Sequence, residues 1–170
     1  AASKMLWAGL HVFDEVTLLR RATLATLHLG GEVVMDDGAV ELRRHLPIWL
    51  AARGRVLVSG LGLGCVVRGL LASPLVDLVD VIEIDRHILR AVGPEFEGNP
   101  RVRLHHGDAL SFEWPAEARW DVAWHDIWCD GSGLQVLHAQ LLARYQGRAA
   151  RQGAWMLPRF VKRRVGGLIG

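Results

Sequence analysis

The sequence predicts an α/β protein with a doubly wound, mainly parallel sheet. From residue 55 onward, short apolar runs of strand length alternate with stretches of helical spacing. A glycine-rich turn, Gly60-Leu61-Gly62-Leu63-Gly64, follows the first apolar run, and acidic residues follow the next three. Because strands that alternate with helices are joined by right-handed crossovers, we expect a parallel, Rossmann-like sheet.

Size and composition fit one globular domain. The chain has 170 residues, of which 51% are hydrophobic and 22% are charged, enough apolar side chains for a sizeable core. We expect an N-terminal helical and extended cap at residues 1–54, followed by a ligand-binding domain at residues 55–170. The net charge of +2 argues against a polyanion binder, and we interpret the basic residues between positions 159 and 164 as a solvated face. We therefore expect no nucleic-acid partner.

The expected elements of the cap come from apolar spacing and turn residues. Helical spacing predicts a helix over residues 12–29, which Gly30-Gly31 ends. An extended segment over residues 32–35 leads to a turn at residues 36–38. We interpret residues 40–52 as a helix interrupted by Pro47.

In the main domain, the same reasoning predicts alternating strands and helices. The strands are expected at residues 55–59, 78–84, 101–105, 120–125 and 153–157. The helices are expected at residues 65–72, 86–92 and 134–150. Ligands of such sheets bind beyond the carboxyl ends of the strands, so the ends of the first four strands form the candidate site.

The glycine turn indicates a ligand that approaches the backbone closely. Glycine at Gly60, Gly62 and Gly64 permits a sharp turn without a side chain in the way. A dinucleotide fingerprint, G-x-G-x-x-G, would need glycine at position 65, where Cys65 stands. The spacing therefore favours an adenosyl-sulfonium cofactor over NAD.

Carboxylates at the second and third strand ends fit an adenosine group. Glu83 lies about 20 residues beyond the glycines, where a carboxylate accepts hydrogen bonds from ribose hydroxyls. It ends an apolar run, where an unpaired carboxylate would be costly. We interpret Asp85 as the cap of the following helix. Asp108 is a candidate acceptor for an exocyclic amine such as that of adenine.

The fourth strand end carries the candidate catalytic residue. Asp126 lies beside the expected cofactor, where a carboxylate orients or deprotonates an amine nucleophile. Trp124 and Trp128 flank it, and Trp128 is the candidate for substrate binding by stacking or by holding a cation; the alternative for both is a place in the core. His105 and His106 are metal-ligand types, but neighbouring strand residues face opposite sides, so no metal is expected.

Other features concern the compartment. The two cysteines, Cys65 and Cys129, are far apart and in no metal-ligand spacing, which fits a reducing, cytoplasmic environment. No run approaches the roughly 20 apolar residues that span a bilayer, so no membrane association is expected. The opening AASK is expected to be a trimmed end.

With these strand ends in place, the chain resembles class I S-adenosylmethionine-dependent methyltransferases, and more narrowly their spermidine-synthase-like branch. The match runs from about residue 33 to residue 157. It is carried by VLVSGLGLG at 56–64, VIEIDRHIL at 81–89, HHGDAL at 105–110 and WDVAWHD at 120–126. The lead-in GEVVMDDGAVELRRHL at 31–46 is also similar to that branch and to guanidinoacetate methyltransferases.

The resemblance implies a role for each matching position around S-adenosylmethionine. Gly60, Gly62 and Gly64 would lie against its methionine and ribose portions, and Glu83 would hold the ribose diol. These are the positions at the first two strand ends.

The remaining implied roles concern adenine and the acceptor. Ile84 would pack on the adenine ring, and Asp108 would bind the adenine amine. Asp126 falls where spermidine synthases keep an acidic residue that acts on the attacking amine.

The departures from that branch concern substrate binding. Leu63 replaces an Asp of the glycine loop, and residues 126–130 replace Asp-Ser-Ser-Asp-Pro. The Tyr-His-Glu signature has no counterpart, residues 44–46 being the nearest stretch. Residues 159–170 are expected to be too short for the C-terminal hairpin that usually completes the sheet in class I methyltransferases. Either the chain is a minimal variant, or a partner or second copy covers the exposed edge, since such an edge invites pairing; we expect a homodimer.

Together these patterns lead to one functional hypothesis and two alternatives. We expect a methyltransferase that uses S-adenosylmethionine on a small amine or hydroxyl acceptor. One alternative is an aminopropyltransferase that uses the decarboxylated cofactor, and the other is a non-catalytic cofactor-binding module.

Overall fold

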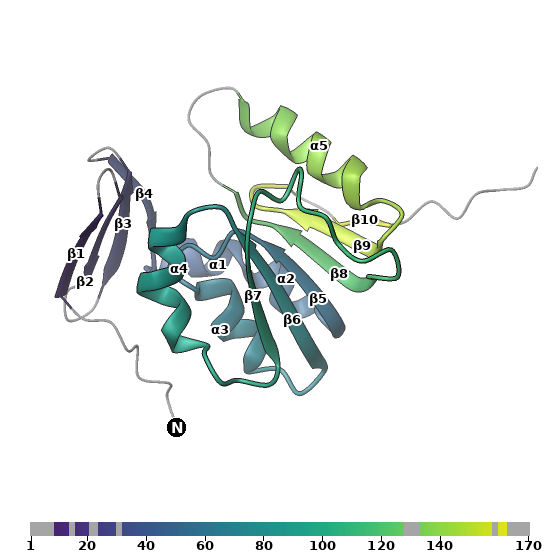
Figure 1. Cartoon of the computed structure of the whole chain (residues 1–170), viewed down its shortest axis with the longest axis horizontal. Coiled ribbons are helices and arrows are strands. Elements are labelled where there is room, and N and C mark those ends of the chain that lie inside the picture. Colours follow the sequence, from purple (N-terminus) through teal and green to yellow (C-terminus); the bar gives the residue numbers. More distant parts are fainter. Residues whose placement is uncertain are drawn as a thin grey trace, which may run out of the picture.

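The computed structural model describes residues 9–13, 16–20, 24–29, 32–127, 133–157 and 160–162. A small antiparallel sheet precedes a larger, mainly parallel sheet that has helices on both faces (Figure 1). The predicted fold class, a Rossmann-like doubly wound sheet, is confirmed.

The small sheet is formed by β1 (Gly9–Phe13), β2 (Val16–Arg20), β3 (Ala25–Leu29) and β4 (Glu32–Asp36), paired antiparallel in chain order. The predicted helix over residues 12–29 is therefore wrong, whereas the extended segment over residues 32–35 is confirmed. In β3, Ala25 and Leu27 are buried while Thr26 and His28 are only half-buried. This alternation has the period of a strand. Apolar residues of β2 and β3 fall at helical spacing by coincidence.

Two short helices, α1 (Ala39–Arg44) and α2 (Leu46–Ala51), connect the two sheets. The predicted helix over residues 40–52 is thus interrupted, but at His45 rather than at Pro47. Pro47 lies in the first turn of α2, where a residue needs no backbone N–H partner and proline fits well.

The large sheet has the order β10-β9-β8-β5-β6-β7. Its strands are β5 (Gly54–Ser59), β6 (Val76–Glu83), β7 (Val102–His106), β8 (Trp120–His125), β9 (Ala149–Ala154) and β10 (Val161–Lys162). Its helices are α3 (Cys65–Leu71), α4 (Arg86–Val92) with the short 3-10 turn η1 (Gly93–Glu95), and α5 (Leu134–Tyr145). The bounds of β8 and α4 match the prediction, but β9 begins at Ala149 rather than at residue 153. Five strands are parallel, and β10 adds a two-residue antiparallel pairing at the β9 edge.

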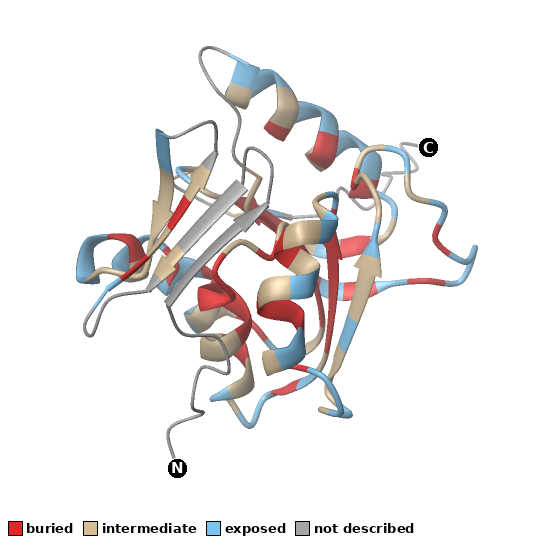
Figure 2. Ribbon diagram, turned by 60° about the vertical axis from the view of Figure 1, so that its left-hand side comes forward, coloured by how far each residue is buried: buried red, intermediate tan, exposed pale blue. Residues whose placement is uncertain are grey.

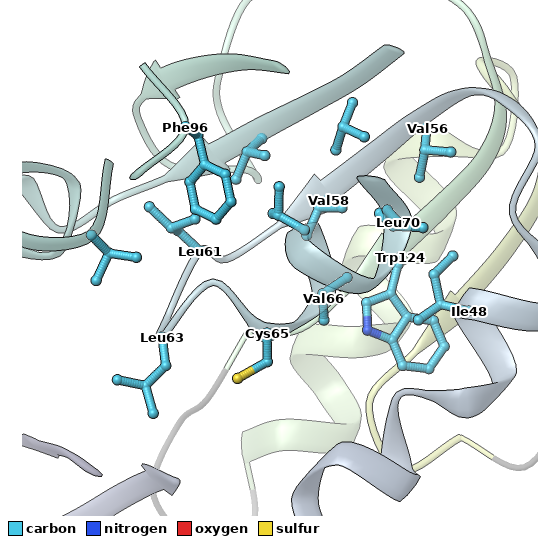
Figure 3. Packing of buried hydrophobic residues seen from close by; sticks show 14 of the residues in the cluster. Ile48, Val56, Val58, Leu61, Leu63, Cys65, Val66, Leu70, Phe96 and Trp124 are labelled. Carbon is cyan, nitrogen blue, oxygen red and sulfur yellow. The ribbon is translucent and has the colours of Figure 1, made fainter. Parts of the chain in front are cut away.

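The two faces of the sheet bury two separate apolar clusters. Val56 and Val58 of β5 pack with α3 residues such as Val66 and Leu70 (Figure 3). Leu57, which points to the opposite face, packs in the cluster under α5. Buried residues accordingly run along the central strands and the inner sides of the helices (Figure 2). A strand with both faces covered reads as a continuous apolar run, which is why β5 was predictable.

Candidate active site at the carboxyl ends of the strands

The candidate site lies where the chain reverses its direction across the sheet. β5 pairs with β6 on one side and with β8 on the other. Along the chain, β6 and β7 therefore follow on one side of β5, and β8 and β9 follow on the opposite side. Open α/β sheets bind ligands beyond the carboxyl ends of the strands at this point. A cavity of about 390 Å³ lies there, a size typical of small-molecule sites. Its wall includes six sequence-predicted residues: Gly60, Gly62, Glu83, Ile84, Asp108 and Asp126.

The first two glycines of the turn are required by close backbone and side-chain contacts. Gly60 and Gly62 have φ angles of 96° and 49°, which side chains rarely tolerate. A Cβ at Gly60 would collide with the backbone carbonyl oxygen of Asp126. A Cβ at Gly62 would lie 2.6 Å from the sulfur of Met35. The turn is therefore fitted to the end of β8 and to the small sheet.

Gly64 has a different environment from the other two glycines. It precedes α3 with a φ of 79° and is not part of the cavity wall. A Cβ there would lie 2.9 Å from the ring of Phe96 and 3.2 Å from Val92. This glycine is required by the packing of α3 against α4 and η1, and its contact with a cofactor stays a prediction.

Glu83 ties the glycine turn to the next helix. It is buried at the end of β6, where Oε2 accepts the N–H of Leu61 at 2.7 Å and Oε1 accepts the N–H of Asp85 at 2.8 Å. Burial raises the pKa of this carboxyl, and the backbone donors oppose that shift. The N–H of Gly62 also donates to this carboxyl. A carboxylate has about four lone-pair positions, so Glu83 retains capacity for a hydroxyl donor from the cavity.

The neighbouring residues on β6 and β7 complete the far side of the cavity. Asp85 caps α4 by accepting the N–H groups of His87 and Ile88, which confirms its predicted role. Ile84 is 64% exposed and presents an apolar surface at the cavity. Asp108 accepts the N–H of Leu110 at 2.9 Å through Oδ1.

Asp126 stands at the end of β8 with a carboxyl that is only 15% exposed. Its backbone N–H donates to the carbonyl oxygen of Ser59 at 2.8 Å, which fixes it beside β5. Burial raises the pKa of Asp126 to about 7, and the nearby Glu41 and Glu83 add to the shift. A carboxyl that titrates near neutral pH is suited to general acid–base chemistry.

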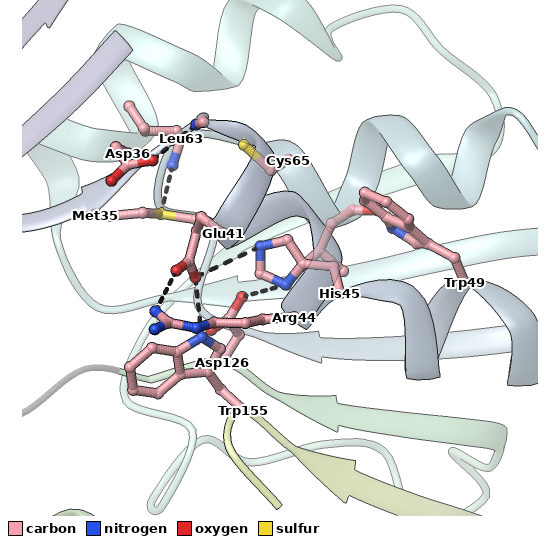
Figure 4. A network of polar contacts seen from close by, with 12 residues as sticks. Met35, Asp36, Glu41, Arg44, His45, Trp49, Leu63, Cys65, Asp126 and Trp155 are labelled. Atoms are coloured by element: carbon pink, nitrogen blue, oxygen red, sulfur yellow. Dashed lines mark hydrogen bonds and ion pairs between the residues drawn. The ribbon is translucent and has the colours of Figure 1, made fainter. Parts of the chain in front are cut away.

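A polar network beside Asp126 was missed in the sequence. Glu41 of α1 accepts hydrogen bonds from Arg44 Nη1 at 2.7 Å and from the indole N–H of Trp155 at 2.9 Å (Figure 4). The His45 side chain lies between Glu41 and Asp126, at 3.9 Å and 3.8 Å from their carboxylate oxygens. The available signal was the i, i+4 spacing of Glu41 and His45, which places both on one side of a helical turn.

The small N-terminal sheet forms another part of the cavity wall, through Leu27, His28, Val34 and Met35. The sulfur of Met35 accepts the N–H of Leu63 at 3.4 Å, so this sheet contacts the glycine turn directly (Figure 4). The cavity is thus built by residues from both sheets.

The tryptophans near Asp126 have different positions. Trp128, the predicted substrate-binding residue, lies outside the described residues. Trp124 is buried in the core against Phe160, with ring centroids 5.7 Å apart, so the core alternative holds for it. Trp155, which was not predicted, lines the cavity instead.

Two further features bear on metals and membranes. The described part of the chain contains no group of three or more His, Cys, Asp or Glu that could hold a metal ion. His105 lies 3.3 Å from Asp80, while His106 lies 3.1 Å from the carbonyl oxygen of Ile84. Among the described residues, no helix is long and apolar enough to cross a bilayer.

Comparison with known proteins gives sequence relatives that match part of the chain. No protein-family model matches. Spermine synthase of Arabidopsis thaliana is 32% identical over 127 residues, which cover 64% of this chain and 34% of that protein. Putrescine N-methyltransferase 2 of Nicotiana tabacum is 29% identical over 135 residues, covering 69% and 36%. Ribosomal RNA small subunit methyltransferase A of Pseudomonas fluorescens is 32% identical over 83 residues, covering 49% and 30%. The chain spans about a third of the length of these relatives.

Solved structures share the fold. The spermidine synthase from Thermotoga maritima matches with a TM-score of 0.61 at 17% identity, covering 85% of this chain and 55% of that chain. A dimethyladenosine transferase from Plasmodium falciparum matches with a TM-score of 0.50 at 23% identity, covering 69% and 41%. The chain therefore has the fold of class I S-adenosylmethionine-dependent methyltransferases. Its sequence is similar to spermine and spermidine synthases and to a putrescine N-methyltransferase.

Proposed function

We propose that the chain binds S-adenosylmethionine in this cavity and transfers the methyl group to a small amine or hydroxyl acceptor. The observation that carries the proposal is the convergence of six strand-end residues, chosen from the sequence, on one cavity. The similarity to methyltransferases and aminopropyltransferases supports a transferase of this kind.

The wall offers suitable groups for each part of the cofactor. Glu83 accepts the ribose hydroxyls, since its backbone donors leave lone pairs for them. The exposed Ile84 side chain packs on the adenine ring, and Asp108 accepts its amine. The bound cofactor supplies a methyl group already activated by the sulfonium. The protein then has only to align the acceptor and exclude water.

The charge of the wall favours an amine acceptor. Besides Asp85, its carboxylates are Glu41, Glu83, Asp108 and Asp126, and no Lys or Arg of the described chain lines the cavity. Such a wall attracts cations and repels phosphate. Asp126 faces this space with a pKa of about 7, so a large fraction of it is carboxylate at neutral pH and can act as a general base toward the acceptor amine.

The same charge supports aminopropyl transfer as a second candidate. The carboxylate of S-adenosylmethionine has no cationic partner in the described wall, and decarboxylated S-adenosylmethionine lacks that carboxylate. Relatives named spermine and spermidine synthase are consistent with this candidate. A non-catalytic module remains the third alternative.

Calorimetric titration with S-adenosylmethionine, its decarboxylated form, S-adenosylhomocysteine and NAD tests the cofactor. We expect S-adenosylmethionine and S-adenosylhomocysteine to bind, and Glu83→Ala to weaken both about 10- to 100-fold through loss of charge-assisted hydrogen bonds. Glu117→Ala, at an exposed loop position, is the matched control and should leave affinity unchanged. Preference for the decarboxylated form would favour aminopropyl transfer, and failure of all four to bind would refute the proposal.

The remaining proposals concern organisation. We propose that residues 1–54 act as a cap that completes the cavity, which is consistent with the positions of Met35 and Glu41. We also keep the homodimer as a proposal, which sedimentation equilibrium tests. Since some relatives are named ribosomal RNA methyltransferases, the acceptor screen includes an RNA hairpin beside small amines.

A further inference from the structure

The His45 side chain is buried but has no hydrogen-bond partner within the described structure. It is fully buried between α1, α2 and the end of β8, and neither ring nitrogen forms a hydrogen bond. Nδ1 lies 3.8 Å from Asp126 Oδ2, and Nε2 lies 3.9 Å from Glu41 Oε1 (Figure 4). Protein hydrogen bonds span about 2.7–3.2 Å, so a movement of less than about 1 Å completes either bond. Buried polar atoms without a partner are rare and call for an explanation.

Charges on each side of the ring determine its state. Arg44 on the same helix and Trp155 from beyond β9 both donate to Glu41, which keeps that carboxylate anchored as an acceptor. Burial lowers the pKa of His45; Glu41 opposes this shift and Arg44 adds to it. The ring is therefore neutral at pH 7.

A neutral imidazole carries one N–H and one bare nitrogen. The anchored Glu41 carboxylate favours the proton on Nε2, which leaves Nδ1 bare toward Asp126. Asp126 also interacts electrostatically with Glu83 and with the Cys65 thiol. These are the titratable groups that face the pair.

We propose that His45 is a positioning residue that links Asp126 to Glu41 and holds the Asp126 carboxyl in its place at the cavity. When Asp126 is protonated, its Oδ2–H donates a hydrogen bond to the bare Nδ1 of His45, and Nε2–H of His45 donates to Glu41. The proton stays on Asp126, because burial raises the pKa of Asp126 and lowers the pKa of His45. Glu41 also pairs with Arg44, which is 42% exposed, so the far end of the chain of groups approaches solvent. The nature of the acceptor rests on the proposed function, but the link between the three side chains does not.

The link is tested without any substrate by nitrogen NMR of the full chain labelled with 15N-histidine, His45 being assigned through His45→Gln. We expect His45 to be neutral at pH 7 with its proton on Nε2. The 15N chemical shift of its Nδ1 should change with pH around a midpoint near 7, as Asp126 titrates, and this change should disappear in Asp126→Asn. His138 of α5, also buried but off the cavity wall, is the internal control and should not respond to that substitution. A charged ring, a proton on Nδ1, or a His45 signal unaffected by Asp126→Asn would overturn the proposal.

A kinetic arm applies where transfer to a small amine is detected. His45→Gln should lower the rate at pH 7 about 10-fold and shift the pH profile, while S-adenosylhomocysteine affinity stays within twofold of wild type. An unchanged pH profile would contradict the proposal. Absence of any transfer activity would count against the proposed function alone, since the NMR result decides the link independently.

Discussion

Two buried aspartates of the same sheet, Asp80 and Asp126, have opposite environments. Asp80 of β6 is 1% exposed and accepts hydrogen bonds from Arg55 at 2.7 Å and from the Trp120 indole at 2.8 Å, with His105 at 3.3 Å. Burial alone would raise the pKa of this carboxyl, but these partners lower it to about 2. Asp80 is thus a permanently charged anchor of the sheet.

Asp126 lacks such a set of cationic partners. Burial raises its pKa to about 7, and the negative charges of Glu41 and Glu83 add to the shift. Burial does not by itself distinguish a structural carboxylate from a chemically useful one. The donors around the group decide, and they leave Asp126 free to exchange a proton at the cavity wall.

The largest effect is expected from Gly60→Ala, which removes the close fit between the glycine turn and Asp126. The added Cβ would collide with the Asp126 carbonyl oxygen at a residue whose φ is already 96°. We expect the free energy of unfolding to fall by about 3 kcal/mol or more, together with loss of S-adenosylhomocysteine binding. Urea denaturation and calorimetry measure the two effects.

Gly147→Ala is the matched control for that substitution. A Cβ at Gly147 would meet nothing within 4 Å, and its φ is not positive. We expect stability to change by less than about 0.5 kcal/mol and binding to stay the same. Equal effects of both substitutions would show that the close contact at Gly60 is unimportant.

Asp80→Asn should lower stability by about 2–3 kcal/mol at pH 7, because it leaves Arg55 without its buried counter-charge. The value lies at the low end for buried pairs since Arg55 is 35% exposed. The folded pKa is below the ordinary 3.8, so this stabilisation is present above pH 3.8 and is lost as the pH falls toward about 2. Urea denaturation from pH 3 to pH 7 checks it. A difference that stays constant over this range would contradict the assignment.

Asp126→Asn should raise the free energy of unfolding at high pH, whereas Asp80→Asn lowers it. Between the ordinary carboxyl pKa of 3.8 and about 7, the folded protein retains a proton that the unfolded chain has released, so Asp126 destabilises the fold increasingly as pH rises through this window. At pH 8 we expect the variant to be more stable than wild type by up to about 4 kcal/mol, the free energy that a shift from 3.8 to about 7 represents, with little difference at pH 4. Thermal and urea denaturation at both pH values measure this, and a loss of stability at pH 8 would mean that Asp126 is a structural anchor like Asp80.

The parallel sheet was largely predictable from the sequence. Strands buried on both faces read as apolar runs, and the glycine turn and the acidic strand ends mark where each strand stops. Glu83, Asp108 and Asp126 followed from that pattern because parallel strands bring their carboxyl ends to one edge.

The rest depended on contacts between segments that are distant in the sequence. The predicted helix over residues 12–29 is wrong because two five-residue strands, β2 and β3, place apolar residues at spacings that a helix also gives. Glu41 and His45 gained their role only through Trp155 and Asp126, which the fold brings to them across the cavity. No local sequence pattern predicts these contacts between distant segments.

The role of Asp126 toward the acceptor's proton is tested by methyl transfer from labelled S-adenosylmethionine to the small amines ethanolamine, putrescine and spermidine. The rate is measured between pH 5.5 and pH 8.5 for wild type and for Asp126→Asn. We expect wild-type transfer to rise with an apparent pKa near 7, and the variant to lose about 100-fold or more while its S-adenosylhomocysteine affinity stays unchanged. Equal loss of transfer and affinity, or a pH profile that the substitution leaves intact, would contradict the assignment of Asp126 as the group that handles the acceptor's proton.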